Sequence, residues 1–234
     1  MSDNTKKNNG YASGHKKIYK GVIFDLDGTL LDTVEDLIFS LNSVLESRNL
    51  KTLAREEFNA VIGYGAKNLC RLAIEKSRTD FDDDYLDAFF EDYQKSYEEN
   101  YKNKSKPYPG ILELIEDLKK RDLSLNVLSN KPDNFTKELI KLHFGPASFD
   151  CVLGEAANFP RKPSPESTLH IVKESGLKAS DFLFVGDGDT DVKTAAGAGV
   201  DFVGVSWGYR TVEELRSAGA QRIVYSVDEL VDIF

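Results

Sequence analysis

Two acidic residues follow an apolar run near the start of the chain, within the segment Gly21–Thr33. If the extended backbone of a strand persists to its end, Asp25 and Asp27 project to the same side, because side chains alternate with a period of two. Two carboxylates in so small a volume repel each other unless a metal ion neutralises them or one of them holds a proton. Gly28 can adopt a positive φ and let the backbone approach a ligand closely. The segment therefore predicts an active site, with a strand followed by an ordinary Asp-Gly turn as the structural alternative.

The same segment resembles the first of four signatures of the haloacid dehalogenase superfamily, D-x-D-G-T-[LV]. Residues that match the other three signatures follow in order: a hydroxyl residue that ends an apolar strand, a lysine in a proline-bearing loop, and G-D-x-x-x-D after another apolar strand. These residues are Ser129 with Asn130, Lys162, and Gly186 with Asp187 and Asp191. The resemblance extends from about residue 19 to the C-terminus.

The resemblance implies a role for each of these residues in phosphoryl transfer. Asp25 would be the nucleophile that attacks phosphorus and forms an aspartyl phosphate. Asp27 would protonate the leaving oxygen and later take a proton from the attacking water. The residues expected to bind the phosphate are Ser129, Asn130 and Lys162.

The resemblance also implies a Mg²⁺ cofactor. Its expected ligands are the side chains of Asp25 and Asp187 and the main-chain carbonyl of Asp27, with Asp191 binding directly or through water. Carboxylates are hard oxygen ligands of the kind that Mg²⁺ prefers. A bound ion would remove the repulsion between the nucleophile and the phosphate.

Composition limits the classes of function. The chain has 234 residues, of which 41% are hydrophobic and 29% charged, which is typical of a globular protein. No apolar run approaches the roughly 20 residues that span a bilayer, so we expect no membrane role. The net charge of −9 disfavours binding to nucleic acid, which needs basic surface. Cys70 and Cys151 are too few and too far apart for a disulfide framework, which favours a reducing, cytoplasmic location.

Short apolar runs alternate with longer helix-like segments, which predicts an α/β fold with a doubly wound parallel sheet. The runs of strand length are Ile18–Phe24, Leu123–Leu128, Cys151–Leu153, Phe182–Val185 and Asp201–Val205. After Thr211 we expect a helix, a short strand at Ile223–Val224 and a final helix.

Almost a hundred residues separate the first two strand-like runs, far more than one crossover helix requires. Apolar residues recur at helical spacing in Thr33–Ser47, Ala66–Ile74 and Tyr85–Tyr101, which predicts an inserted all-helical domain. We therefore expect a flexible tail at 1–17, a core domain formed by 18–32 and 106–234, and a helical cap domain at 33–105. In the superfamily that the chain resembles, such a cap opens and closes over the site.

The segment Val61–Leu69 is similar to the phosphoglycolate phosphatase branch of the superfamily. Gly63 and Gly65 could present free amides to an anionic group of the substrate, and Lys67 and Arg71 share one helical face. The alternative is an ordinary helix entrance with solvated basic residues.

The predicted function is hydrolysis of a small phosphorylated metabolite, and the oligomeric state stays open. Members of the superfamily that remove halide lack the second acid, so the presence of Asp27 argues against dehalogenation. A sugar phosphomutase similar to β-phosphoglucomutase is an alternative, although the histidine usual in those enzymes is missing from Val34–Ile38. A phosphate-sensing or partner-binding module without turnover is a second alternative.

Overall fold

A computed structural model describes residues 17–59, 61–156 and 158–234. Its main sheet has six parallel strands in the order β5-β4-β1-β6-β7-β8, so that the first strand lies in the middle. These strands are β1 (Gly21–Phe24), β4 (Ser124–Pro132), β5 (Cys151–Glu155), β6 (Phe182–Gly186), β7 (Asp201–Val205) and β8 (Ile223–Val224). The chain winds outward from β1 in both directions, which confirms the predicted fold class.

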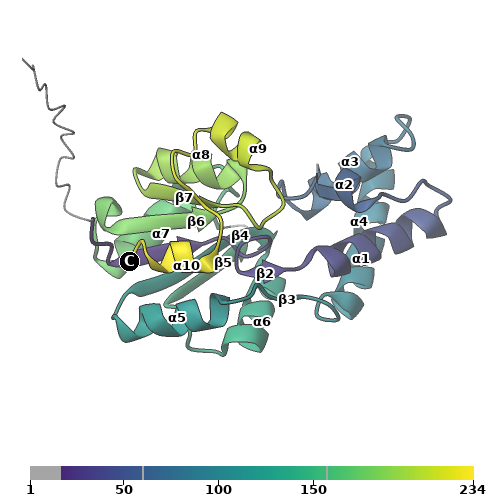
Figure 1. The fold of residues 1–234 in the computed structure, drawn as a ribbon. Helices are drawn as coiled ribbons and strands as arrows, with labels where there is room; N and C mark the ends of the chain where they lie inside the picture. The colour runs from purple at the N-terminus through teal and green to yellow at the C-terminus, as the bar shows by residue number, and fades with distance from the viewer. Residues whose placement is uncertain (1–16, 60, 157) are drawn as a thin grey trace, which may run out of the picture.

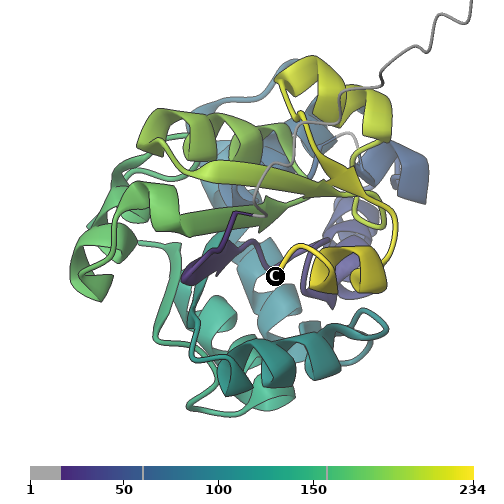
Figure 2. The same cartoon turned by 60° about the vertical axis from the view of Figure 1, so that its left-hand side comes forward.

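Helices cover both faces of this sheet (Figures 1 and 2). They are α5 (Ile111–Lys120), α6 (Asp133–Phe144), α7 (Glu166–Ser175), α8 (Asp189–Ala198), α9 (Val212–Ala218) and α10 (Val227–Val231), with a 3₁₀ turn η1 (Ala179–Asp181) before β6. The side chains of β1 alternate between the two faces. Val22 and Phe24 are buried in one hydrophobic cluster and Ile23 in another, and all three are fully buried. The central strand is therefore apolar on both sides, as parallel sheets require.

Four helices are inserted between β1 and β4: α1 (Val34–Ser47), α2 (Arg55–Asn59), α3 (Ala66–Glu75) and α4 (Asp83–Asn100). They lie together beyond the end of the sheet (Figure 1). The strand before these helices, β2 (Leu31–Asp32), pairs with the strand after them, β3 (Lys106–Pro107), in a two-stranded antiparallel ribbon. The boundaries of the cap domain at 33–105 stay a prediction, since the helices and the sheet also share hydrophobic contacts.

The predicted elements differ from the observed ones mainly at their ends. The first strand begins at Gly21 instead of Ile18. The helix expected from Tyr85 begins at Asp83, because the side chain of Asp82 accepts a hydrogen bond from the Tyr85 amide at 2.8 Å and caps the helix. The short helix α2 and the β2–β3 ribbon were not predicted.

The predicted flexible tail at 1–17 lies outside the described residues except for Lys17, which pairs with Asp201 at 2.7 Å. Within the described ranges, no helix is both long and apolar enough to span a bilayer.

Candidate active site

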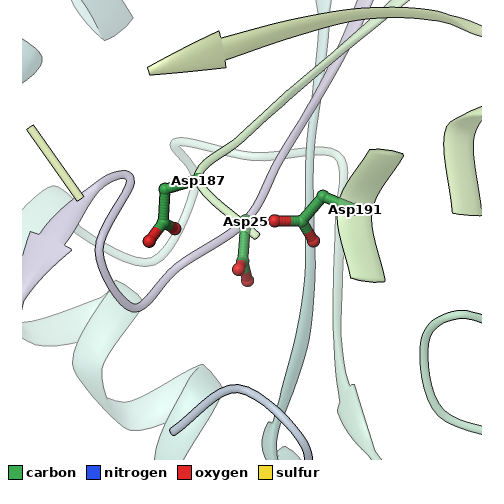
Figure 3. A group of neighbouring side chains, drawn as sticks. All are labelled: Asp25, Asp187 and Asp191. Carbon is green, nitrogen blue, oxygen red and sulfur yellow. The ribbon is translucent and has the colours of Figure 1, made fainter. Parts of the chain in front are cut away.

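The polar residues that follow the central strands meet at one edge of the sheet, because parallel strands end on the same side. Asp25 comes directly after β1, and its amide donates to the carbonyl of Val185 in β6 at 2.9 Å. Asp187 follows β6, and Asp191 lies in the first turn of α8. Figure 3 shows the three carboxylates close together. Oxygen atoms of these three side chains lie within 4.8 Å of one another.

A single buried lysine contacts two of these acids. Lys162 Nζ lies 2.8 Å from Asp25 Oδ1 and 2.7 Å from Asp191 Oδ1. It also donates to the main-chain carbonyl of Leu128 at 3.0 Å. The lysine side chain is 1% exposed, so its charge lies inside the protein beside the acids.

Burial and mutual repulsion disfavour the charged forms of the acids. The pKa of Asp25 is raised well above its usual value, first by burial and then by the negative charge of Asp191. The pKa of Asp187 is raised to about 7 for the same two reasons. Burial by itself would lower the pKa of Lys162, but Asp191 and Asp25 outweigh it and raise the pKa above that of a free lysine.

Three carboxylates against one ammonium leave an excess of negative charge in a buried place. Hard carboxylate oxygens at this spacing fit a divalent ion such as Mg²⁺, which would neutralise that excess. The acidic group is therefore a possible metal site. The main-chain carbonyl of Asp27 was also predicted as a ligand, and that role stays a prediction.

The side chain of Asp187 is held in place from three directions. It accepts hydrogen bonds from Thr29 Oγ1 at 2.9 Å and from the Tyr209 amide at 2.8 Å. Gly28 lies against it with a φ of +85°, and a Cβ there would come within 2.4 Å of Asp187 Oδ2. Glycine is thus required at this turn both for the backbone conformation and for the close approach.

Asp27 has its own cation, which the sequence analysis did not identify. Lys131 Nζ lies 2.7 Å and 2.9 Å from the two carboxylate oxygens of Asp27. Thr33 Oγ1 donates to the same carboxylate at 2.5 Å. The one signal in the sequence was a lysine next to Asn130 at the end of an apolar run, a place where an unpaired charge is rarely buried.

Asn130 fastens the loop that carries Lys162. Its Nδ2 donates to the main-chain carbonyls of Lys162 and Gly63, each at 3.0 Å, and its Oδ1 accepts from the Lys162 amide at 2.8 Å. Both amide protons are therefore in use, which leaves this side chain no free donor for a phosphate. Ser129 lines the same cavity as Asp25, and its predicted contact with phosphate stays a prediction.

Asp25, Asp27 and Asp187 line a cavity closed by residues of the helical insertion, among them Gly63, Gly65 and Tyr97. Two polar contacts hold the loop after α2 against the core. Tyr64 Oη donates to Asp189 Oδ1 at 3.0 Å, and Arg210 Nη2 donates to the carbonyl of Ile62 at 2.7 Å. The predicted glycines thus reach the active-site cavity.

Lys67 and Arg71 are not brought to this cavity. Lys67 pairs with Asp87, and Arg71 pairs with Asp83 at 3.0 Å, both on α4. The two basic residues line a separate shallow groove with Arg161. Their predicted contact with the substrate has no support in this arrangement, because their charges are already paired and lie outside the cavity.

Comparison with known proteins agrees with this geometry. The profile of the family described as haloacid dehalogenase-like hydrolase matches residues 22–205. A phosphoglycolate phosphatase of Mesorhizobium japonicum is 31% identical over 209 residues, which cover 89% of this chain and 92% of that protein. A phosphoglycolate phosphatase of Vibrio parahaemolyticus is 29% identical over 217 residues, covering 92% and 95%.

Among solved structures, a predicted phosphoglycolate phosphatase from Haemophilus somnus has a TM-score of 0.86 and 29% identity, covering 92% of this chain and 97% of that one. The fold and these relatives thus define a hydrolase whose candidate site lies at one edge of a parallel sheet. The chain belongs to the haloacid dehalogenase-like hydrolase family, and it is a phosphatase. The expectation of an enzyme is confirmed, which disfavours the alternative of a phosphate-sensing module.

Proposed function

We propose that the chain is a Mg²⁺-dependent phosphatase that hydrolyses a small phosphate monoester of the phosphoglycolate type through an aspartyl phosphate on Asp25. The observation that carries the proposal is the Asp25 carboxylate beside two further buried acids and one lysine. With a divalent ion bound between the acids, this combination would hold a phosphate that the acids alone would repel. The similarity to named phosphoglycolate phosphatases supports the substrate class.

Bound Mg²⁺ would be held by Asp25, Asp187 and Asp191, and it would supply positive charge to the phosphate oxygens. The Asp25 carboxylate attacks the phosphorus atom, and the bond to the leaving oxygen breaks. Lys162 binds the charge that spreads over the phosphoryl oxygens.

Asp27 gives a proton to the leaving oxygen in the first step. In the second step it takes a proton from the water that hydrolyses the aspartyl phosphate. Closure of the helical insertion over the cavity excludes bulk water during the first step, and the contacts of Tyr64 and Arg210 support such closure.

The experiment is the release of inorganic phosphate from p-nitrophenyl phosphate with Mg²⁺ or with excess chelator. We expect Asp25→Asn to lower kcat by at least about 10³-fold, because an amide is a far weaker nucleophile. Wild-type release should fall to background in chelator. Full turnover by Asp25→Asn would contradict the mechanism.

A matched control is Asp228→Asn, which changes an acid on α10, and it should keep normal turnover. Transfer of phosphate between two positions of a sugar, with little phosphate released, would favour the phosphomutase alternative instead. Action on a cytoplasmic metabolite is part of the proposal, and both cysteines are free thiols.

A further inference from the structure

The active-site cavity is lined by three cationic side chains among the described residues, and only one of them faces the leaving-group side. Lys162 is engaged by Asp25 and Asp191. Arg210 donates to the main-chain carbonyls of Asn59 and Ile62 in the insertion. Lys131 contacts Asp27, and its side chain is 3% exposed.

The position of Lys131 follows from the role of its partner. Asp27 must reach the leaving oxygen, so a cation within 2.7 Å of Asp27 lies beside the leaving group. Lys131 contacts no member of the Asp25, Asp187 and Asp191 group, so its charge is separate from the one that holds the phosphate. A substituent on the carbon next to the ester oxygen would come within reach of its flexible side chain.

Tyr97 adds a second polar group at this end of the cavity. It lies under Lys131, whose Nζ is 5.0 Å from the centre of the tyrosine ring. Within the described part of the chain its buried hydroxyl has no hydrogen-bond partner, although the residue is only 3% exposed. A buried hydroxyl without a partner is costly, so a ligand that accepts its proton would be stabilised.

Several apolar side chains also line this cavity. They include Leu37, Ile62, Leu69 and Phe135. An anionic group that enters an apolar cavity loses its hydration and needs charged or polar donors in return. Lys131 and Tyr97 are placed to provide them.

We propose that Lys131 and Tyr97 form a subsite that binds a carboxylate on the leaving group, and that the enzyme thereby selects phosphate esters of short hydroxy acids. The inference rests on the proposed function and deepens it. Two donors of Lys131 stay on Asp27, so the third ammonium proton and the tyrosine hydroxyl are left for the ligand. An ester whose leaving group is neutral would offer both of them a weaker acceptor, which lowers its affinity.

Two esters that differ only at this group test the proposal: 2-phosphoglycolate, which has a carboxylate, and 2-hydroxyethyl phosphate, which has a hydroxymethyl group in its place. The variants are Lys131→Met, Lys131→Arg and Tyr97→Phe, with Lys137→Met as a control. Lys137 is an exposed lysine of α6 that pairs with Asp133, so its loss changes the net charge equally.

We expect the wild type to prefer 2-phosphoglycolate in kcat/KM. Lys131→Met should abolish most of that preference, with a loss about 10- to 100-fold greater on the carboxylated ester, expressed mainly in KM. Lys131→Arg should keep part of the preference for 2-phosphoglycolate, because arginine carries the same positive charge. Tyr97→Phe should lower the preference several-fold, and Lys137→Met should leave it unchanged.

Equal losses on the two esters in Lys131→Met would overturn the subsite, because they would show that the lysine acts only by positioning Asp27. Should Lys131→Met fail to fold, Tyr97→Phe takes its place, and an unchanged preference in that variant would overturn the subsite. A wild type that hydrolyses both esters with equal efficiency would also refute it. None of these outcomes bears on the Asp25→Asn experiment. Full turnover by Asp25→Asn, in contrast, would refute the proposed function itself.

Discussion

Individual residues of the site are fixed by contacts that leave little room for change. Asp187 shows this best, because it is buried, accepts two hydrogen bonds and lies against Gly28. Its position decides where a metal ion would lie relative to Asp25. A methyl group added at Gly28 should therefore lower the rate of the reaction as well as the stability of the fold.

We expect Gly28→Ala to lower kcat at least about 10-fold, because the new methyl group would displace the Asp187 carboxylate. Gly176→Ala is the control, since Gly176 also has a positive φ, of +70°, but a Cβ there meets no atom within 4 Å. It should cost about 1 kcal/mol of stability with activity kept. Steady-state kinetics and urea unfolding of both variants check this. Equal activity in the two variants would show that the close approach to Asp187 does not matter.

Among the elements, the two ends of the helical insertion are held together by the β2–β3 ribbon and by a buried acid. Asp36 in the first turn of α1 is 2% exposed. Its carboxylate accepts from the amides of Lys104 and Ser105 and from Ser105 Oγ, at 2.8 to 3.0 Å. The start of the insertion is thereby tied to its end, next to β3.

Asp36→Ala should destabilise the protein by about 2 to 4 kcal/mol, because several hydrogen bonds to a charged group are lost and buried amides are left without partners. Asp92→Ala is the matched change on α4, where Asp92 forms a half-exposed ion pair with Arg48 at 2.6 Å. That variant should cost less than about 1 kcal/mol. Urea unfolding measures both. The tie would be unimportant if Asp36→Ala cost no more than Asp92→Ala.

At the scale of the whole molecule, the site concentrates negative charge in a chain that already carries a net charge of −9. Lys162 offsets part of this charge. Without a metal ion the remainder opposes folding, since the folded state must bury carboxylates that the unfolded chain exposes to water. Metal binding and folding stability should therefore depend on each other and on pH.

Burial raises the pKa of Asp187 to about 7 in the folded protein, whereas an unfolded chain has a value of roughly 4. Since the folded state binds this proton more tightly, metal-free protein loses stability as the pH rises from about 4 through 7. We expect the loss between pH 6 and pH 8 to be on the order of 1 kcal/mol. Saturating Mg²⁺ should raise the melting temperature more at pH 8 than at pH 6.

Scanning calorimetry with Mg²⁺ or chelator at both pH values measures this effect. Asp187→Asn should show a smaller pH dependence and a smaller response to Mg²⁺. An equal Mg²⁺ response in this variant and the wild type would argue against Asp187 as a ligand.

Local patterns in the sequence were sufficient for the fold class and for the residues that follow each central strand. Runs such as Phe182–Val185 are apolar because a central parallel strand is buried on both faces, and the acids stand directly after such runs. Tertiary structure decided which side chains pair. Lys131 meets Asp27 across 104 residues of sequence, Asn130 is used to hold the Lys162 loop, and Lys67 and Arg71 turn to the acids of α4. Such pairings depend on which elements lie close together in space although they are far apart along the chain. Local periodicity in the sequence carries no information about that proximity.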